Sequence, residues 1–160
     1  PPGRTKLLKG IKKSWIIDDS YNSSPLAAIS AIETLAIFKD YRKIAILGDM
    51  LELGEYTEKA HCNLGVKAAE VCDFIIAVGL RAKFIYDEAL SRGFNKENIF
   101  YFDQHQVEEA GKFLQKKINS GDMILIKGSQ EMRMEKIVKE IMAEPEKAKE
   151  LLVRQDYKDA

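Results

Sequence analysis

Short apolar runs alternate with longer amphipathic segments along most of this 160-residue chain. The runs have the length and composition of buried strands, and most are followed by a segment in which apolar residues recur at helical spacing. Parallel strands must be joined by crossovers, so a strand–helix unit repeated about five times with short links predicts a mostly parallel sheet. We therefore expect an α/β fold of three layers, with five or six strands and helices on both faces.

Six segments are predicted to be strands, and they are residues 5–9, 13–18, 43–47, 73–78, 98–102 and 123–127. Helices are predicted over residues 25–39, 57–71 and 81–92, over a segment that ends near residue 118, and over a segment that carries Met134, Ile137, Val138, Ile141 and Met142. Ser24 is a suitable N-cap for the first helix, and Pro25 suits its first turn. The charged tail after Pro145 is expected to form one more helix or to fray.

Charge and composition exclude several classes of protein. The 25 basic and 25 acidic residues cancel, whereas nucleic-acid binding needs a basic excess. No apolar run approaches the roughly 18 residues of a transmembrane helix, and no secretory signal region is present. Cys62 and Cys72 are the only cysteines, which predicts free thiols and a cytoplasmic protein. The chain begins Pro1-Pro2-Gly3-Arg4 without a methionine, so we expect a domain cut from a longer protein.

The segment 16–25 is the first place to look for chemistry. It joins an apolar run to two adjacent carboxylates, Asp18 and Asp19, then to a polar loop with Tyr21 and Asn22, and then to a helix start. In open parallel sheets, ligands bind at the carboxyl ends of the strands. The polar loop is therefore expected to lie where a ligand would bind.

If the strands are parallel, their carboxyl ends meet along one edge of the sheet, which we call the rim. The rim would hold Asp18, Asp19, Tyr21, Asn22, Gly48, Asp49, Gly79, Asp103, Lys127, Gly128 and Ser129. Carboxylates can accept hydrogen bonds from sugar hydroxyls or an amine, and Lys127 can neutralise a phosphate or a carboxylate. Backbone N–H groups at Gly128 and Ser129, opening a helix, could bind an anion.

Most of these residues also have a purely structural explanation. Asp103 and Ser129 could be helix caps, and glycines are ordinary turn residues in α/β domains. The adjacent pair Asp18 and Asp19 is harder to explain in this way, because neighbouring carboxylates repel and one cap would suffice. His61 and His105 lack the spacing of metal ligands, so no metal site is expected, and His61 is predicted to be a partly exposed helix residue. The phosphate-binding P-loop and dinucleotide-binding glycine motifs are missing.

Four segments resemble the Mur ligase family. They are Pro2-Gly3-Arg4, Asp18-Asp19-Ser20-Tyr21-Asn22, Leu47-Gly48-Asp49-Met50-Leu51-Glu52-Leu53-Gly54 and Lys127-Gly128-Ser129. The resemblance runs from residue 2 to about residue 142 and is closest to the branch that adds D-alanyl-D-alanine. It implies a ligase of three domains, of which this chain would be the third, a Rossmann-like α/β domain. Residues 1–12 would end the central ATPase domain and form the hinge, 13–143 would be the third domain, and 144–160 a charged tail or extra helix.

The resemblance also implies a reaction. Such ligases act in peptidoglycan precursor synthesis: ATP activates a carboxylate as an acyl phosphate, which an amine then attacks. The substrates would be UDP-N-acetylmuramoyl-tripeptide and D-Ala-D-Ala, and the cofactors ATP and Mg²⁺. The P-loop and the metal sites would lie upstream of Pro1, and the protein partners would be the enzyme's own N-terminal and central domains. The isolated third domain is therefore expected to be inactive.

Residue roles follow from the same resemblance. Arg4, Asp19, Tyr21 and Asn22 would bind the nucleotide, with Asp19, in preference to Asp18, on the ribose. Lys127 and Ser129 would be the catalytic candidates beside the incoming amino acid. The substrate-binding set would be Asp49, Met50, Glu52, Leu53, Gly128 and Arg133. Two departures from the family pattern are Ser23-Ser24-Pro25 in place of Ala-Asn-Pro, and Gln130 where an arginine commonly follows Lys-Gly-Ser, so that Arg133 would have to clamp a carboxylate instead.

Two other functions remain open at this point. A phospho-acceptor receiver also places two acidic residues after its first strand and a lysine after its last, as Asp18, Asp19 and Lys127 do. However, its third strand should end in the acceptor aspartate, and here that strand ends in Gly79. The other alternative is a non-catalytic interaction domain that uses the rim to bind a protein.

Overall fold

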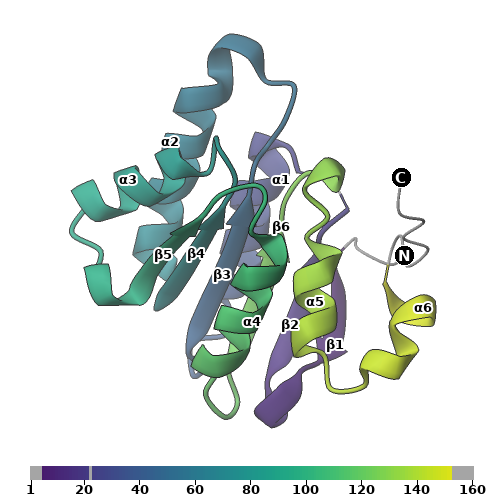
Figure 1. Ribbon diagram of the computed structural model, residues 1–160. Coiled ribbons are helices and arrows are strands. Elements are labelled where there is room, and N and C mark those ends of the chain that lie inside the picture. The colour runs from purple at the N-terminus through teal and green to yellow at the C-terminus, as the bar shows by residue number, and fades with distance from the viewer. Residues whose placement is uncertain (1–4, 22, 153–160) are drawn as a thin grey trace.

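A single sheet with the strand order β1-β2-β6-β3-β4-β5 runs through the centre of the described structure (Figure 1). The computed structural model describes residues 5–21 and 23–152. The strands are β1 (Lys6–Lys9), β2 (Trp15–Asp19), β3 (Lys43–Gly48), β4 (Phe74–Val78), β5 (Ile99–Phe102) and β6 (Met123–Lys127). β1 is antiparallel to β2, and every other pairing in this sheet is parallel. The predicted fold class, α/β with a mostly parallel sheet, is confirmed.

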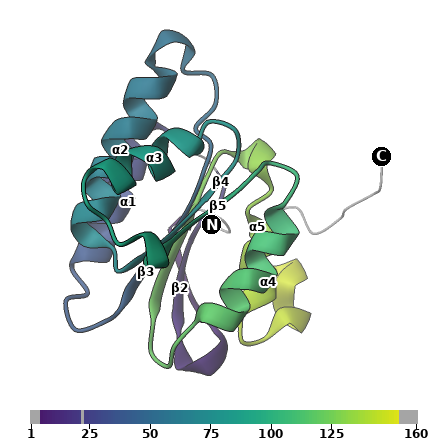
Figure 2. The same cartoon turned by 60° about the vertical axis from the view of Figure 1, so that its left-hand side comes forward.

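Helices cover both faces of the sheet, as Figure 2 shows most clearly. One face carries α1 (Pro25–Ala36), α2 (Thr57–Val71) and α3 (Lys83–Ser91). The other face carries α4 (Val107–Lys117), α5 (Glu135–Ile141) and the short α6 (Ala148–Leu151). The three predicted layers are therefore present, and the charged tail adds one turn of helix before residue 153.

Helix ends differ from the predicted ones for local reasons. Ser24 caps α1 as expected, because its hydroxyl oxygen accepts the Ala27 N–H at 3.2 Å. That helix stops at Ala36, three residues early, since the next amides bond three residues back and tighten the turn. Asp103 and Gln106 do bond to each other, through Asp103 N–H and the Gln106 side chain at 3.0 Å. They close a turn ahead of α4, which begins only at Val107.

The core is divided by the sheet into two apolar clusters, and successive strand residues alternate between them. Ile16 faces the α4–α5 side, and Ile17 faces the α1–α3 side. The same alternation runs along β3 and β6, so that Ile126 faces α4–α5 and Leu125 faces α1–α3. At the rim this alternation decides to which side each polar side chain points. The predicted core stripe that begins at Met134 lies in the α4–α5 cluster.

Glycine lets α2 and α3 approach closely. A Cβ at Gly65 would lie 2.7 Å from the carbonyl oxygen of Ile85, which is backbone and cannot turn away. Gly111 in α4 also faces another helix, but a Cβ there would meet chiefly the Glu140 side chain, at 3.1 Å, which is flexible. Both glycines lie within helices, so they form a matched pair for substitution. A methyl group would meet a backbone oxygen at Gly65 but a flexible side chain at Gly111.

Gly65→Ala is expected to lower the free energy of unfolding by about 1–3 kcal/mol, because overpacking outweighs the helix propensity gained. Gly111→Ala is expected to change it by less than about 1 kcal/mol, because the added propensity offsets mild crowding. Urea unfolding of the 160-residue chain measures both. A Gly65→Ala variant at least as stable as Gly111→Ala would contradict the packing.

Candidate functional site

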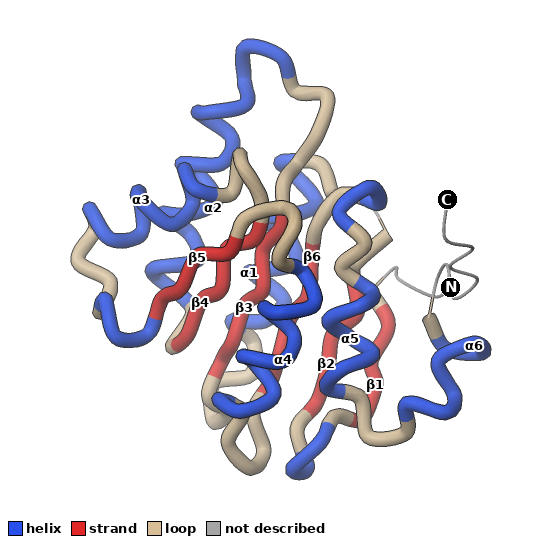
Figure 3. The backbone as a smooth tube through the Cα atoms, viewed as in Figure 1, coloured by secondary structure: helices blue, strands red, loops and turns tan. Residues whose placement is uncertain are grey.

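The sheet order brings four strand ends together at one edge. β2, β6, β3 and β4 are consecutive neighbours, so Asp19, Lys127, Gly48 and Val78 end adjacent parallel strands (Figure 3). The rim expected from the sequence therefore exists as one continuous surface. It has two parts, one beside α1 and one between β6, β3 and β4.

The first part of the rim is built around an ion pair. Asp19 and Lys127 are register partners on neighbouring parallel strands, and alternation points both toward α1. The Lys127 Nζ lies 2.9 Å from Asp19 Oδ2, with 3% of the lysine and 13% of the aspartate side chain exposed. The other carboxylate oxygen of Asp19 accepts the Thr5 N–H at 3.3 Å. Such a charge-assisted contact fixes the orientation of both side chains, although desolvation offsets most of its net free energy.

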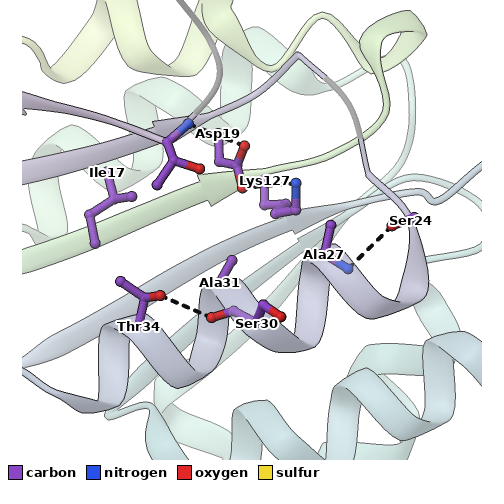
Figure 4. A pocket seen from close by; sticks show the side chains of 9 residues that line it. Ile17, Asp19, Ser24, Ala27, Ser30, Ala31, Thr34 and Lys127 are labelled. Atoms are coloured by element: carbon purple, nitrogen blue, oxygen red, sulfur yellow. Dashed lines mark hydrogen bonds and ion pairs between the residues drawn. The ribbon is translucent and has the colours of Figure 1, made fainter.

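A cavity of about 430 Å³ opens beside this ion pair (Figure 4). Its floor is the α1 surface, which presents Ser24, Ser30 and Thr34 among small alanines. Hydroxyls and a carboxylate around one cavity suit a ligand rich in hydroxyl groups. This helix face is not among the site residues predicted from the sequence. The three- and four-residue intervals between Ser24, Ala27, Ser30, Ala31 and Thr34 could have indicated it.

Asp18 points to the opposite side of the sheet and is fully buried. Its Oδ1 accepts two hydrogen bonds from Ser20, from the hydroxyl at 2.6 Å and from the backbone N–H at 3.2 Å. Its Oδ2 has no hydrogen-bond partner among the described residues. Burial raises the pKa of Asp18, the Ser20 bonds oppose that rise, and the nearby charges of Asp19 and Glu135 add to it. The two adjacent carboxylates therefore do not share a site, which argues against the receiver alternative.

The second part of the rim is organised by residues 49–51, which we call the hub segment. The carbonyl of Asp49 accepts the Ser129 N–H at 3.0 Å, and the Ser129 hydroxyl oxygen accepts the Leu51 N–H at 3.0 Å. Ser129 thereby joins the loop after β6 to the loop after β3. Met50, which lies between Asp49 and Leu51 in the sequence, is fully buried in the α1–α3 cluster.

The carboxylate of Asp49 fastens the hub segment to the start of α3. Its Oδ1 accepts the Ala82 N–H at 2.7 Å, and its Oδ2 pairs with Arg81 at 3.2 Å. Gly79 makes room for this carboxylate, since a Cβ there would lie 2.4 Å from Asp49 Oδ1, and its φ of +120° excludes most other residues. Arg81 was missed in the sequence, where nothing marks its partner 32 residues away.

These contacts correct two expectations. The proposed anion site at the Gly128 and Ser129 amides is wrong for Ser129, because its N–H is already bonded to the Asp49 carbonyl and only a three-residue 3₁₀ turn follows. Asp49 and Met50 have no exposed surface, so they can shape a substrate site only from beneath. Glu52 is exposed and has a φ of +62°, so it faces outward from the loop, whereas Leu53 is half-buried and packs against the α1–α3 cluster.

His61 was expected to be partly exposed, and this was wrong. It lies on α2 with no exposed surface. Its Nδ1 lies 2.6 Å from the carbonyl oxygen of Thr57, and its Nε2 accepts the Met50 N–H at 3.0 Å. Burial lowers the pKa of this imidazole, the Thr57 carbonyl and Asp49 oppose the shift, and Arg81 adds to it. The four-residue spacing to Thr57 was visible in the sequence, but the contact with Met50 was not.

The remaining predicted residues do not all join this surface. Arg133 lines a separate cavity of about 480 Å³, together with Lys112 and Lys136, and its Nε donates to Glu135 at 2.8 Å. Tyr21 is half-buried at the end of the first loop. Asp103 is exposed and accepts the His105 N–H, as a local cap would. Arg4 and Asn22 lie outside the described residues.

Some features of the chain have no part in the rim. Cys62 and Cys72 are free thiols, as predicted. Within residues 5–21 and 23–152, no three His, Cys, Asp or Glu side chains are grouped so that they could hold a metal ion. No described helix has both the length and the apolar character needed to cross a membrane.

Comparison with known proteins gives consistent matches. Residues 3–130 match the family described as Mur ligase, glutamate ligase domain. The UDP-N-acetylmuramoyl-tripeptide–D-alanyl-D-alanine ligase of Bacillus subtilis (strain 168) is 32% identical over 144 residues, which are 89% of this chain and 31% of that protein.

Solved structures agree with the sequence matches. The crystal structure of the MurF ligase from Thermotoga maritima in complex with ADP aligns with a TM-score of 0.73 at 29% identity, over 92% of this chain and 32% of that one. MurF from Acinetobacter baumannii aligns with a TM-score of 0.70 at 27% identity, over 86% and 30% of the two chains. The chain thus spans about a third of the length of these relatives.

Asp18→Asn tests the burial of the first carboxylate. A raised pKa means that the folded state favours the protonated form, so this group's contribution to stability is present below its ordinary pKa of 3.8 and is lost as the pH rises through the folded value. Asparagine keeps the oxygen that Ser20 needs but does not ionise. The wild type is therefore expected to lose stability relative to the variant as the pH rises above about 4 and through the folded value of Asp18.

Urea unfolding of both proteins across this range is the measurement, with Asp40→Asn, at an exposed turn, as the control for removing a carboxylate. A stability difference between wild type and Asp18→Asn that does not change with pH would contradict the assignment.

Proposed function

This chain belongs to the Mur ligase family, and from that premise we propose that it is the C-terminal domain of a D-alanyl-D-alanine-adding ligase. The full-length protein would join D-Ala-D-Ala to UDP-N-acetylmuramoyl-tripeptide, with ATP as the energy source, in peptidoglycan precursor synthesis. The observation that carries the proposal is that the loops with the family's motifs, 18–21, 48–54 and 127–129, meet at one rim.

The proposal also assigns the parts of the chain. Residues 1–12 lead from the end of the central domain through the hinge, with β1 already paired to β2. Residues 13–143 are the C-terminal domain, and 144–160 are an added tail. The P-loop and the Mg²⁺ sites are proposed to lie in the central domain, outside this chain. Both substrates are soluble, one of them a nucleotide, so the reaction belongs in the cytoplasm.

The reaction needs charge neutralisation and close positioning more than it needs new covalent chemistry. ATP phosphorylates the terminal carboxylate of the tripeptide, the amine of D-Ala-D-Ala attacks the acyl phosphate, and the tetrahedral intermediate expels phosphate. Holding the amine and the acyl phosphate at contact distance lowers the entropic part of the barrier. Positive groups fixed before the reaction stabilise the charge that develops on phosphate and carbonyl oxygens.

The two parts of the rim suit the two sides of this reaction. Asp19 and the hydroxyl-lined cavity beside α1 form the nucleotide side, where the carboxylate accepts hydrogen bonds from the ribose. Arg4, Tyr21 and Asn22 complete that side through the hinge and the first loop. Lys127 lies on this nucleotide side as the ion-pair partner of Asp19, and its ammonium group is proposed to neutralise a phosphate or a carboxylate there.

The dipeptide side is formed by the loop 48–54 and the loop after β6. Glu52 faces outward there and Leu53 is half-exposed beside it, whereas Asp49, Met50 and Gly128 are buried beneath the loop surface. The Ser129 hydroxyl accepts the Leu51 N–H and can still donate its own hydrogen to a substrate oxygen. Arg133 would reach a substrate carboxylate only from the neighbouring cavity, after releasing Glu135.

The full-length protein is expected to release phosphate from ATP only when both the UDP-linked tripeptide and D-Ala-D-Ala are present. A coupled phosphate assay with each component omitted in turn measures this, and L-Ala-L-Ala is the matched control substrate. The 160-residue chain alone should give no turnover. Turnover by that chain alone, or phosphate release by the full-length protein that ignores the dipeptide, would reject the proposal.

Asp19→Ala in the full-length enzyme is expected to raise the KM for ATP about tenfold, because a ribose hydroxyl loses its charged acceptor. The KM for D-Ala-D-Ala should rise less than about threefold. Asp40→Ala, at an exposed turn after α1, is the control for loss of a carboxylate. Equal changes in the two KM values would show that Asp19 is not on the nucleotide side.

A further inference from the structure

His61 has a bonding pattern that admits only one form of the imidazole. The carbonyl oxygen of Thr57 cannot donate, so the hydrogen between it and Nδ1, 2.6 Å apart, must be on Nδ1. The Met50 N–H must donate, so Nε2, at 3.0 Å, must be an unprotonated acceptor. The side chain is fully buried between these partners. The structure therefore requires a neutral imidazole in a single tautomer.

His61 accepts a hydrogen bond from Met50, the middle residue of the hub segment. Each residue of that segment has one backbone group bonded outside its own loop: the Asp49 carbonyl and the Leu51 amide to Ser129, and the Met50 amide to His61. Two of these bonds come from the loop after β6, and the third comes from α2. His61 is thus the contact that ties the hub segment to α2, in addition to the two bonds that tie it to Ser129.

We infer that His61 is a positioning residue for the incoming dipeptide, acting through the Met50 amide. This inference rests on the proposed function, since it assumes that the loop 48–54 forms the dipeptide side. The imidazole touches no substrate. It fixes the position of the hub segment, and with it the exposed Glu52 and the half-buried Leu53 that follow directly.

An apolar side chain could fill the same volume but could not replace this contact. Without an acceptor, the buried Met50 N–H would have to break away toward water, because an unpaired buried donor is costly. The hub segment would then move, although the helix and the core around it could remain intact. Loss of the acceptor should therefore change dipeptide binding more than it changes the fold.

Protonation should have the same effect as removing the acceptor. An imidazolium would present an N–H to the Met50 N–H, and the bond would be replaced by repulsion. The charged groups that act on His61 are Asp49, from the hub segment, and Arg81, at the start of α3. Burial lowers its pKa below the ordinary 6.5, so the contact is intact at neutral pH and is lost as the pH falls through the folded value.

Two substitutions separate the acceptor from the rest of the side chain. In His61→Gln, the amide oxygen can take the place of Nε2 and accept the Met50 N–H. In His61→Asn, the amide can still donate to Thr57 but is too short to reach Met50. His105→Gln, which changes the exposed histidine of the chain, is the control.

In the full-length enzyme at pH 7.5, His61→Asn is expected to raise the KM for D-Ala-D-Ala about tenfold, with the KM for ATP changed less than about twofold. His61→Gln should stay within about threefold of the wild type. As the pH falls below 6.5 and through the folded pKa of His61, the wild-type KM for the dipeptide should rise relative to that of His61→Gln. The ratio of the wild-type KM to the His61→Gln KM cancels the titration of the dipeptide's own amine, which affects both enzymes equally. The KM of His105→Gln should follow that of the wild type.

Hydrogen exchange of the peptide 48–54, measured in the same full-length proteins without substrates, gives a second readout. Exchange should be faster in His61→Asn and restored in His61→Gln. Any of three results would overturn the inference. They are an unchanged KM for the dipeptide in His61→Asn, an equal rise of the two KM values in that variant, and a His61→Gln variant as impaired as His61→Asn. If the wild type shows no dipeptide-dependent turnover, the proposed function fails, and unchanged exchange in His61→Asn would separately reject the positioning contact.

Discussion

The hub segment has two fully buried residues, Asp49 and Met50, followed by the half-buried Leu51, and buried backbone groups there need hydrogen-bond partners. Ser129 supplies two of the partners and His61 supplies the third, while the Asp49 carboxylate binds the segment to the start of α3. A loop without regular structure is thereby bonded at each of its three residues to other parts of the fold. The close approach at Gly79 follows from the same requirement, because the buried carboxylate leaves no room for a Cβ.

The alternation of strand residues explains why two adjacent carboxylates can coexist at the rim. Asp19 turns toward α1 and pairs with Lys127, whereas Asp18 turns into the α4–α5 side and bonds to Ser20. The pair thus divides into one group at a polar cavity and one group that burial drives toward its protonated form. A site that needs two carboxylates facing one ligand, as in a receiver, cannot be built from them.

Much of the fold could be predicted, because apolar periodicity and parallel crossovers determine layers and strand ends. The strand order could not, and with it the pairing of Asp19 with Lys127 stayed hidden, since periodicity does not say which strands are neighbours. His61 and Arg81 were misjudged or missed for a related reason. Their partners, Met50 and Asp49, belong to a loop whose path depends on tertiary contacts, so a single sequence carries no local signal for the bond.

The most direct test of the account is a crystal structure of the full-length protein with D-Ala-D-Ala and a non-hydrolysable ATP analogue. The account predicts the dipeptide between the loop 48–54 and residues 127–129, with the hub segment placed as described here, and the ribose within hydrogen-bond distance of Asp19. A dipeptide bound in the cavity beside Arg133, or a ribose remote from Asp19, would contradict it.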